Sequence, residues 1–228
     1  MKIKNPFNDL TKFEKGLWMI SVCMTVLSFL ISGGGDILSM TASLIGVTAL
    51  IFIAKGYVLG QVLTVVFSIF YGIVSFYFRY YGEMITYLCM TAPIAVLSVV
   101  SWLRHPYEGT KEVEVNRITK KQVTVMIILT VIVTFIFYFI LKALKNENLF
   151  FSTISITTSF IASYLTFLRS PYYAVGYAAN DIVLIILWIF ATIEDISYLP
   201  MVICFVMFFI NDMYGFYNWE KMRVKQNK

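Results

Sequence analysis

The feature that most constrains this chain is a series of eight apolar segments, each long enough to cross a membrane as a helix. A helix rises 1.5 Å per residue, so about 20 mainly apolar residues cross roughly 30 Å of hydrocarbon. The segments cover about residues 17–32, 37–54, 58–78, 84–102, 122–141, 150–168, 172–193 and 198–217. Short separators with glycine, proline or charged residues divide them. The pattern predicts an all-α integral membrane protein with eight transmembrane helices.

The composition agrees with a location in the lipid bilayer. Hydrophobic residues make up 59% of the chain and charged residues 14%, against roughly 25% charged residues in soluble domains. The three cysteines lie in apolar segments without CxxC spacing, and His105 is the single histidine, so we expect no metal or cofactor. The net charge of +5 is spread over several loops, which favours membrane topology over nucleic-acid binding.

The positions of Lys and Arg predict the orientation. With the N-terminus inside, all of the eighteen basic residues except Arg79, Lys142 and Lys145 fall on the cytoplasmic side. Cytoplasmic loops carry such an excess. We therefore expect a multi-pass plasma-membrane protein with both termini in the cytoplasm. The first apolar segment is not followed by an A-x-A cleavage pattern, so the N-terminal segment is expected to be retained.

The segments also contain an internal repeat. Placing Gly60 on Gly176 aligns KGYVLGQVLTV with PYYAVGYAAND, and with one residue of slippage Trp102 meets Trp219. Segments two to four thus resemble segments six to eight, and the fifth segment restores the direction between them. This predicts a 3+1+3 plan of parallel, SWEET-like triple-helix repeats after one extra N-terminal helix. Such repeats are typical of transporters, although two apolar helices can also align by chance.

The repeat divides the chain into four parts. We predict a cytoplasmic leader and extra helix at 1–36, a first three-helix repeat at 37–102, a cytoplasmic loop and inverting linker helix at 103–149, and a second three-helix repeat with a basic tail at 150–228.

Polar side chains follow two of the segments at helical spacing. In the third segment they are Gln61, Thr64, Ser68, Tyr71 and Ser75, and in the seventh they are Tyr173, Tyr177, Asn180 and Trp188. Residues three and four apart lie on one face of a helix. Since the two stripes fall at matching places in the repeats, we expect one shared cavity. Ordinary helix packing is the alternative, and it accounts best for the serines.

Two Asn-Asp pairs, Asn180-Asp181 and Asn211-Asp212, offer more donors and acceptors than helix packing requires. Each Asp lies about 100° around the helix from its Asn and need not face the cavity. Aromatic rings beside amides suit a flat ligand with polar edges. The candidate substrate-binding residues are Gln61, Thr64, Tyr173, Tyr177, Asn180, Trp188, Asn211 and Tyr214.

The stretch NDMYGFYNW, from Asn211 to Trp219, resembles the signature of the PnuC family of nicotinamide riboside transporters, and 3+1+3 is the plan of that family. The resemblance extends from about residue 37 to the end. It implies facilitated diffusion of a ribosylated vitamin or nucleoside, most of all nicotinamide riboside, with trapping by a cytoplasmic kinase. Asn211, Tyr214 and Trp219 match the signature, and Asn180 matches the asparagine of the seventh span in that family.

One departure leaves the cargo open. Members of that family often carry W-x-x-W ahead of the asparagine, where this chain has Tyr173 and Gly176. A deoxynucleoside, thiamine or riboflavin is therefore an alternative cargo for the same fold. Ion coupling and a homo-oligomer also remain open.

Other classes of function fit less well. A membrane enzyme would use Asp181, Asp212 and Glu83 as acid and base, but these lie in different segments, and such chemistry needs two groups within reach of one ligand. The sequence contains no GxxxxGK[ST] loop for binding the phosphates of ATP, which argues against ATP-driven pumping by this chain. A sensory or scaffold protein would have no use for two polar stripes.

Overall fold

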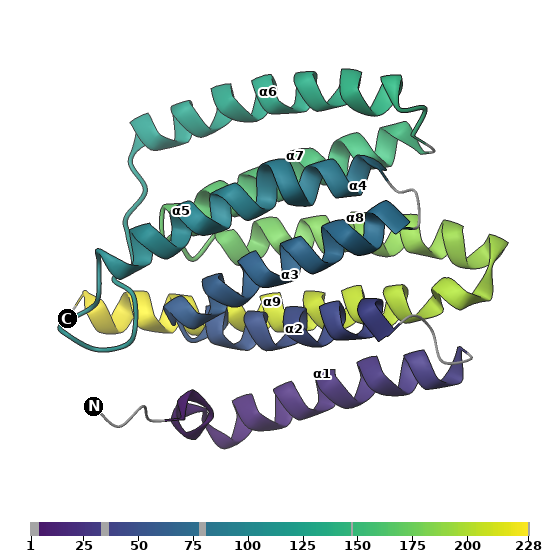
Figure 1. Ribbon diagram of the computed structural model, residues 1–228. Helices are drawn as coiled ribbons and strands as arrows, with labels where there is room; N and C mark the ends of the chain where they lie inside the picture. Colours follow the sequence, from purple (N-terminus) through teal and green to yellow (C-terminus); the bar gives the residue numbers. More distant parts are fainter. Residues whose placement is uncertain (1–4, 33–36, 78–80, 147, 228) are drawn as a thin grey trace.

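The computed structural model describes residues 5–32, 37–77, 81–146 and 148–227 (Figure 1). Arg79 and part of the predicted turn at 32–36 lie outside these residues. Within the described chain, eight helices are long and apolar enough to cross a membrane, which confirms the predicted number. They are α1 (Lys12–Ile31), α2 (Ile37–Ala54), α3 (Val58–Tyr77), α4 (Tyr81–Thr86) continued by α5 (Ala92–Leu103), α6 (Lys120–Ala143), α7 (Leu149–Phe167), α8 (Tyr173–Glu194) and α9 (Leu199–Gln226).

The first and last helices are longer than their apolar segments. α1 begins at Lys12 because Thr11 and Glu14 form a capping box, in which each side chain accepts a hydrogen bond from the backbone N–H of the other. α9 continues to Gln226 because glycine and proline are absent from the polar stretch after Gly215, so that stretch remains helical.

The fourth span is interrupted by a π-helical turn at Tyr87–Thr91. Pro93 follows in the first turn of α5 and has no N–H to offer the preceding turn. The wider π-helical turn forms at this position, and such turns occur frequently at functional sites. Two of its side chains, those of Tyr87 and Thr91, line the cavity that is described below.

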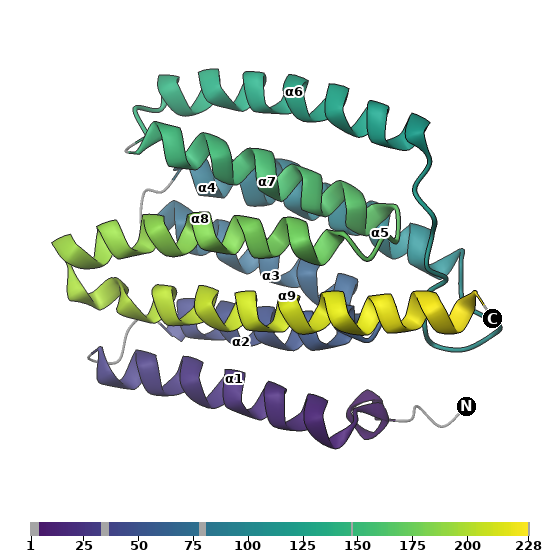
Figure 2. The same ribbon diagram turned by 180° about the vertical axis from the view of Figure 1, so that it is seen from behind.

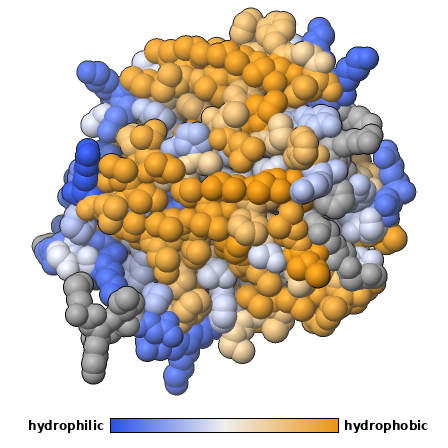
Figure 3. Space-filling model, viewed as in Figure 1, coloured by the Kyte–Doolittle hydropathy of each residue, from blue (hydrophilic) through white to orange (hydrophobic). Residues whose placement is uncertain are grey.

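The helices lie roughly side by side, and both termini are at the same end of the bundle, which we call the terminal end (Figures 1 and 2). The opposite end is called the distal end. α6 packs on α7 at one edge, whereas α1 packs on α2 and α9 at the other. Apolar side chains cover the middle of the face in Figure 3, and hydrophilic ones gather mostly toward its margins. This belt suits a protein surrounded by lipid.

Two tryptophans join helices that are distant in the sequence. Trp102 of α5 donates its Nε1–H to the carbonyl of Thr166 at 3.0 Å, one residue before the end of α7. Trp219 of α9 donates in the same way to the carbonyl of Ile53 at 2.8 Å, one residue before the end of α2. The two indole rings lie 5.3 Å apart and are buried. They close the core at the terminal end.

Candidate substrate site

A cavity of about 60 Å³ lies between α2, α3, the π-helical turn, α7, α8 and α9. Its polar lining is Gln61, Thr64, Thr91, Ser159, Tyr177, Asn180, Asp181 and Asp212. Its apolar lining includes three phenylalanine rings, those of Phe67, Phe205 and Phe208. The lining contains two acidic side chains and lacks Lys, Arg and His among the described residues. Polar groups at membrane depth are costly unless they are paired or face water or a ligand.

Four of the eight candidate residues meet at this cavity, namely Gln61, Thr64, Tyr177 and Asn180. The Tyr177 hydroxyl lies 3.0 Å from the Ser163 hydroxyl of α7. The carboxamide nitrogen of Gln61 is buried and has no hydrogen-bond partner among the described residues. A buried donor without a partner costs roughly 1–3 kcal/mol. Gln61 is thus positioned to donate to a ligand.

The carbonyl oxygen of Asn180 is held by α7. It accepts hydrogen bonds from the hydroxyls of Ser155 at 3.0 Å and Thr158 at 2.9 Å. These bonds fix the orientation of the amide. Its NH2 group then has two donors for other partners at the cavity.

Asp181 of α8 and Asp212 of α9 also line the cavity, so two acids from neighbouring helices face the same space. Each residue is only 3% exposed. The second carboxylate oxygen of Asp181 has no hydrogen-bond partner among the described residues. The two acids therefore meet at one cavity, contrary to the expectation that acids on different segments lie apart.

Asn211 and Tyr214 are turned away from the cavity and bind α1. The Asn211 amide donates to the Ser21 hydroxyl at 2.9 Å and to the carbonyl of Met207 at 2.7 Å. The Tyr214 hydroxyl donates to Glu14 at 2.8 Å, and Glu14 also pairs with Lys55 at 3.1 Å. A polar face of α9 is thus used to dock the extra helix. One helical step separates Asn211 from Asp212, so the acid faces the cavity and the amide does not.

Tyr173 and Trp188 lie beyond opposite sides of the cavity. Tyr173 is buried against Trp219, with ring centroids 5.1 Å apart, and it packs between the cavity and the terminal end. Trp188 belongs to the apolar core and contacts Tyr198, with ring centroids 5.7 Å apart. Neither side chain lines the cavity in this conformation, and a substrate contact by either one stays a prediction.

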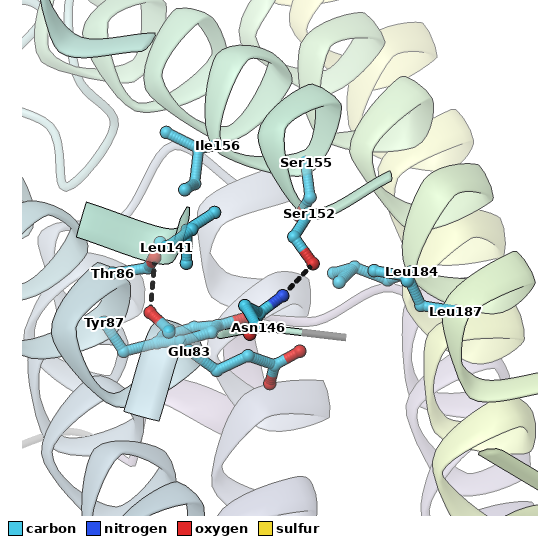
Figure 4. A pocket seen from close by; sticks show the side chains of 11 residues that line it. Glu83, Thr86, Tyr87, Leu141, Asn146, Ser152, Ser155, Ile156, Leu184 and Leu187 are labelled. Carbon is cyan, nitrogen blue, oxygen red and sulfur yellow. Dashed lines mark hydrogen bonds between the residues drawn. The ribbon is translucent and has the colours of Figure 1, made fainter. Parts of the chain in front are cut away.

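A ring cluster separates the cavity from the distal end. Tyr87 packs on Tyr71 at 4.4 Å and on Phe67 at 5.8 Å between ring centroids. The Tyr71 hydroxyl donates to the carboxylate of Glu83 at 2.7 Å. Glu83 lines a second, smaller pocket on the distal side, to which Tyr87 also contributes. Figure 4 shows this distal pocket, where the Asn146 amide donates to the Ser152 hydroxyl.

The central cavity is much smaller than a ligand site for a nucleoside. Its volume is about 60 Å³, whereas ligand pockets usually measure roughly 300–1,000 Å³. Aromatic rings pack near both ends of it: Tyr87 lines the cavity toward the distal end, and Tyr173 packs on Trp219 toward the terminal end. Admission of a nucleoside therefore requires the surrounding helices to separate.

Comparison with known proteins identifies relatives of the whole bundle. Residues 36–221 match the family model described as nicotinamide mononucleotide transporter. The nicotinamide riboside transporter PnuC of Neisseria mucosa is 24% identical over 95% of this chain and 84% of its own length. The nicotinamide riboside transporter PnuC of Haemophilus influenzae is 22% identical over 83% of this chain and 82% of its own length.

The fold is also similar to a solved structure. The crystal structure of the vitamin B3 transporter PnuC superposes with a TM-score of 0.82 at 23% identity, over 95% of this chain and 94% of the other. The arrangement of eight spans is therefore shared with that protein.

Proposed function

We propose that this chain, which belongs to the nicotinamide mononucleotide transporter family, carries nicotinamide riboside across the plasma membrane by facilitated diffusion. The family and its structural neighbour are transporters, so the chain is a membrane transporter and not an enzyme. Asp181 and Asp212 do line the same cavity, so their positions on different segments do not by themselves argue against an enzyme. The relatives carry the argument here.

The observation that favours this cargo is the charge of the central cavity. Nicotinamide riboside contains a positively charged pyridinium ring. The cavity offers two acidic side chains, Asp181 and Asp212, without Lys, Arg or His in its described lining, and the faces of several aromatic rings. A cation in a desolvated, ring-lined site gains both ion pairing and cation–π attraction. Neutral deoxynucleosides and riboflavin would leave that charge without a partner, whereas thiamine is a cation and remains the main competitor.

The remaining lining residues suit the neutral parts of the cargo. We assign Gln61 and Asn180 to the carboxamide and the ribose hydroxyls, Tyr177 to ring contact, and Thr64 to an additional hydroxyl contact. Each of these side chains lies at the cavity and carries a donor, an acceptor or a ring of the required kind.

We further propose the 3+1+3 plan of two parallel triplets, α2 to α5 and α7 to α9, with α6 as the inverting linker. The two tryptophan hydrogen bonds support this plan. Trp102 of the first triplet binds the end of α7, the first helix of the second triplet, and Trp219 of the second triplet binds the end of α2, the first helix of the first triplet. The residues just before them act alike: the Ser101 hydroxyl donates to the last carbonyl of α7, from Phe167, at 2.9 Å, and the Asn218 amide donates to the last carbonyl of α2, from Ala54, at 2.8 Å. Helix ends leave such carbonyls without intrahelical partners.

The orientation and the partners complete the proposal. The terminal end carries both termini and most of the basic residues, so we place it in the cytoplasm. Phosphorylation of the cargo by a cytoplasmic kinase would keep the internal concentration low and sustain uptake without coupling to ions. A homo-oligomer is compatible with this scheme.

Uptake into proteoliposomes tests the proposal. Purified protein without a kinase should equilibrate labelled nicotinamide riboside until the internal and external concentrations are equal, with the molecule chemically intact. Empty liposomes are the control, and unlabelled thiamine, riboflavin and deoxynucleosides are added as competitors. Stronger competition by one of these than by nicotinamide riboside itself would reassign the cargo. Recovery of altered ligand would point to an enzyme.

A further inference from the structure

A further pocket, lined mostly by polar side chains, opens at the terminal end, away from both the central cavity and the distal pocket. It measures about 240 Å³ and lies between the connection after α5, the α7–α8 turn and the end of α9. Three arginines from these three parts of the chain line it, namely Arg117, Arg169 and Arg223. The only acidic side chain in its described lining is Glu114. A pocket so formed concentrates positive charge where three distant segments meet.

Hydrogen bonds hold the arginines in place without using all their donors. Arg169 donates to the backbone carbonyl of Glu114 at 3.1 Å and to the Ser101 hydroxyl at 3.3 Å. Arg117 donates to Asn227 at 2.7 Å, while Arg223 pairs with Glu220. A guanidinium has five N–H donors in a planar fork. These bonds therefore leave several donors for a further acceptor.

The nearby acids do not neutralise this charge. Glu112 pairs with Lys225 at 3.3 Å, outside the pocket lining. Glu114 lines the pocket and Glu220 pairs with Arg223, so against three guanidinium groups these two acids leave a formal excess of one positive charge. Burial lowers the pKa of Arg169, and Glu114 opposes this only in part. An anion would relieve the cost of placing a half-buried guanidinium there.

We infer that this pocket is a phosphate-binding site, in which Arg117, Arg169 and Arg223 hold the phosphate group of a small phosphate ester. The fork of arginine matches phosphate oxygens two at a time, and arginine is favoured wherever such recognition matters. The volume accommodates a phosphate with a sugar-sized substituent. The same chemistry occurs in a lipid headgroup and in a soluble sugar phosphate. The inference does not depend on the cargo proposed for the central cavity.

Calorimetric titration of the full chain tests the site in phosphatidylcholine nanodiscs. The probes are inorganic phosphate and ribose 5-phosphate, and we expect the latter to bind more tightly, with an affinity that falls as salt rises. The double variant Arg117→Gln/Arg223→Gln should weaken binding at least tenfold. Arg104→Gln is the matched control, because Arg104 is an exposed arginine of the same connection that does not line the pocket, and it should change the affinity less than twofold.

A second experiment, with an anionic lipid, distinguishes a lipid headgroup from a soluble sugar phosphate as the ligand. Nanodiscs that contain phosphatidylglycerol are analysed by native mass spectrometry for retained lipid. Retention that is lost in the double variant, without binding of either soluble probe, would support the site with a headgroup as its ligand. Loss of binding in Arg104→Gln equal to that in the double variant would overturn the inference, as would absence of both soluble binding and retained lipid.

Discussion

At the scale of single residues, the contrast between Asp212 and its neighbour Asn211 decides how α9 is used. Burying an isolated charged group in hydrocarbon costs far more free energy than burying an amide. A polar cavity therefore lowers that cost more for the acid than for the amide. The structure places Asp212 beside Asp181 at the cavity and gives Asn211 a partner on α1. Two polar residues in succession thus serve two different faces of one helix.

Removal of the negative charge tests the role of the acid pair. Asp181→Asn and Asp212→Asn together should lower the uptake of nicotinamide riboside at least tenfold, because the pyridinium loses its counter-charge. Reduced nicotinamide riboside, which has the same size but a neutral ring, should be affected less than threefold. Initial rates in proteoliposomes measure both. Equal losses for the two compounds would show that the pair acts through structure and not through charge.

The sequence predicts part of the site and misses the acids for a definite reason. The period of three and four residues correctly places Gln61 and Thr64, and also Tyr177 and Asn180, on faces that meet. It cannot choose between Asn and Asp when the two are adjacent, because the spacing alone does not say which of two neighbouring helix faces is turned to the cavity. The cost of burying a carboxylate is the signal that would have favoured Asp181 and Asp212.

At the scale of helices, α1 is attached to the bundle mainly through α9 and α2. Asn211 binds Ser21, Tyr214 binds Glu14, and the Trp18 indole donates to the Thr48 hydroxyl at 3.1 Å. The family match begins at residue 36, just after this helix. The candidate residues of α9 therefore have a structural task that periodicity alone does not reveal.

Two asparagine substitutions separate binding from docking. Asn180→Ala should raise the concentration for half-maximal uptake at least fivefold while leaving the thermal midpoint within about 2 °C, since the side chain lies at the cavity. Asn211→Ala should instead lower the thermal midpoint in detergent and leave that concentration unchanged, because α1 loses a buried bond worth about 1 kcal/mol. If Asn211→Ala instead raised the concentration for half-maximal uptake and left the thermal midpoint unchanged, Asn211 would be assigned to the substrate site.

Close packing of α7 and α8 gives a second prediction for the elements. A Cβ atom added at Gly176 would lie 2.9 Å from the Cα of Ala162, which is backbone and cannot move aside. Gly176→Ala should destabilise the protein by about 1–3 kcal/mol through overpacking. Gly16→Ala is the control, since no atom lies within 4 Å of its added Cβ. Thermal unfolding compares the two, and equal midpoints would contradict the close approach.

At the scale of the whole molecule, the sequence predicts the number of spans better than the helix boundaries. The number follows from apolar length, which every membrane-spanning helix must satisfy. The first and last residues of a helix depend on capping side chains and on the absence of glycine and proline. Thr11 at the start of α1 and the polar end of α9 show this. The π-helical turn depends on Pro93 within its tertiary surroundings, and no pattern of hydrophobicity indicates it.

The hydrogen bonds of Trp102 to α7 and of Trp219 to α2 predict coupling between the two proposed triplets. Trp102→Phe and Trp219→Phe should each cost about 1 kcal/mol of stability, and the double variant should deviate from their sum because the rings touch. Each should also slow maximal uptake severalfold. Trp18→Phe removes a comparable bond outside the triplets and should slow uptake little. Additive losses with unchanged uptake in all variants would show that these hydrogen bonds are not part of the transport cycle.

The small volume of the central cavity has a consequence for the direction of flow. In this conformation the cavity is smaller than the proposed cargo, so we expect the carrier to be able to complete the return half of its cycle unloaded. Such a carrier does not need to bring one molecule out for each molecule it takes in. We therefore expect net delivery down a gradient without obligatory one-for-one exchange.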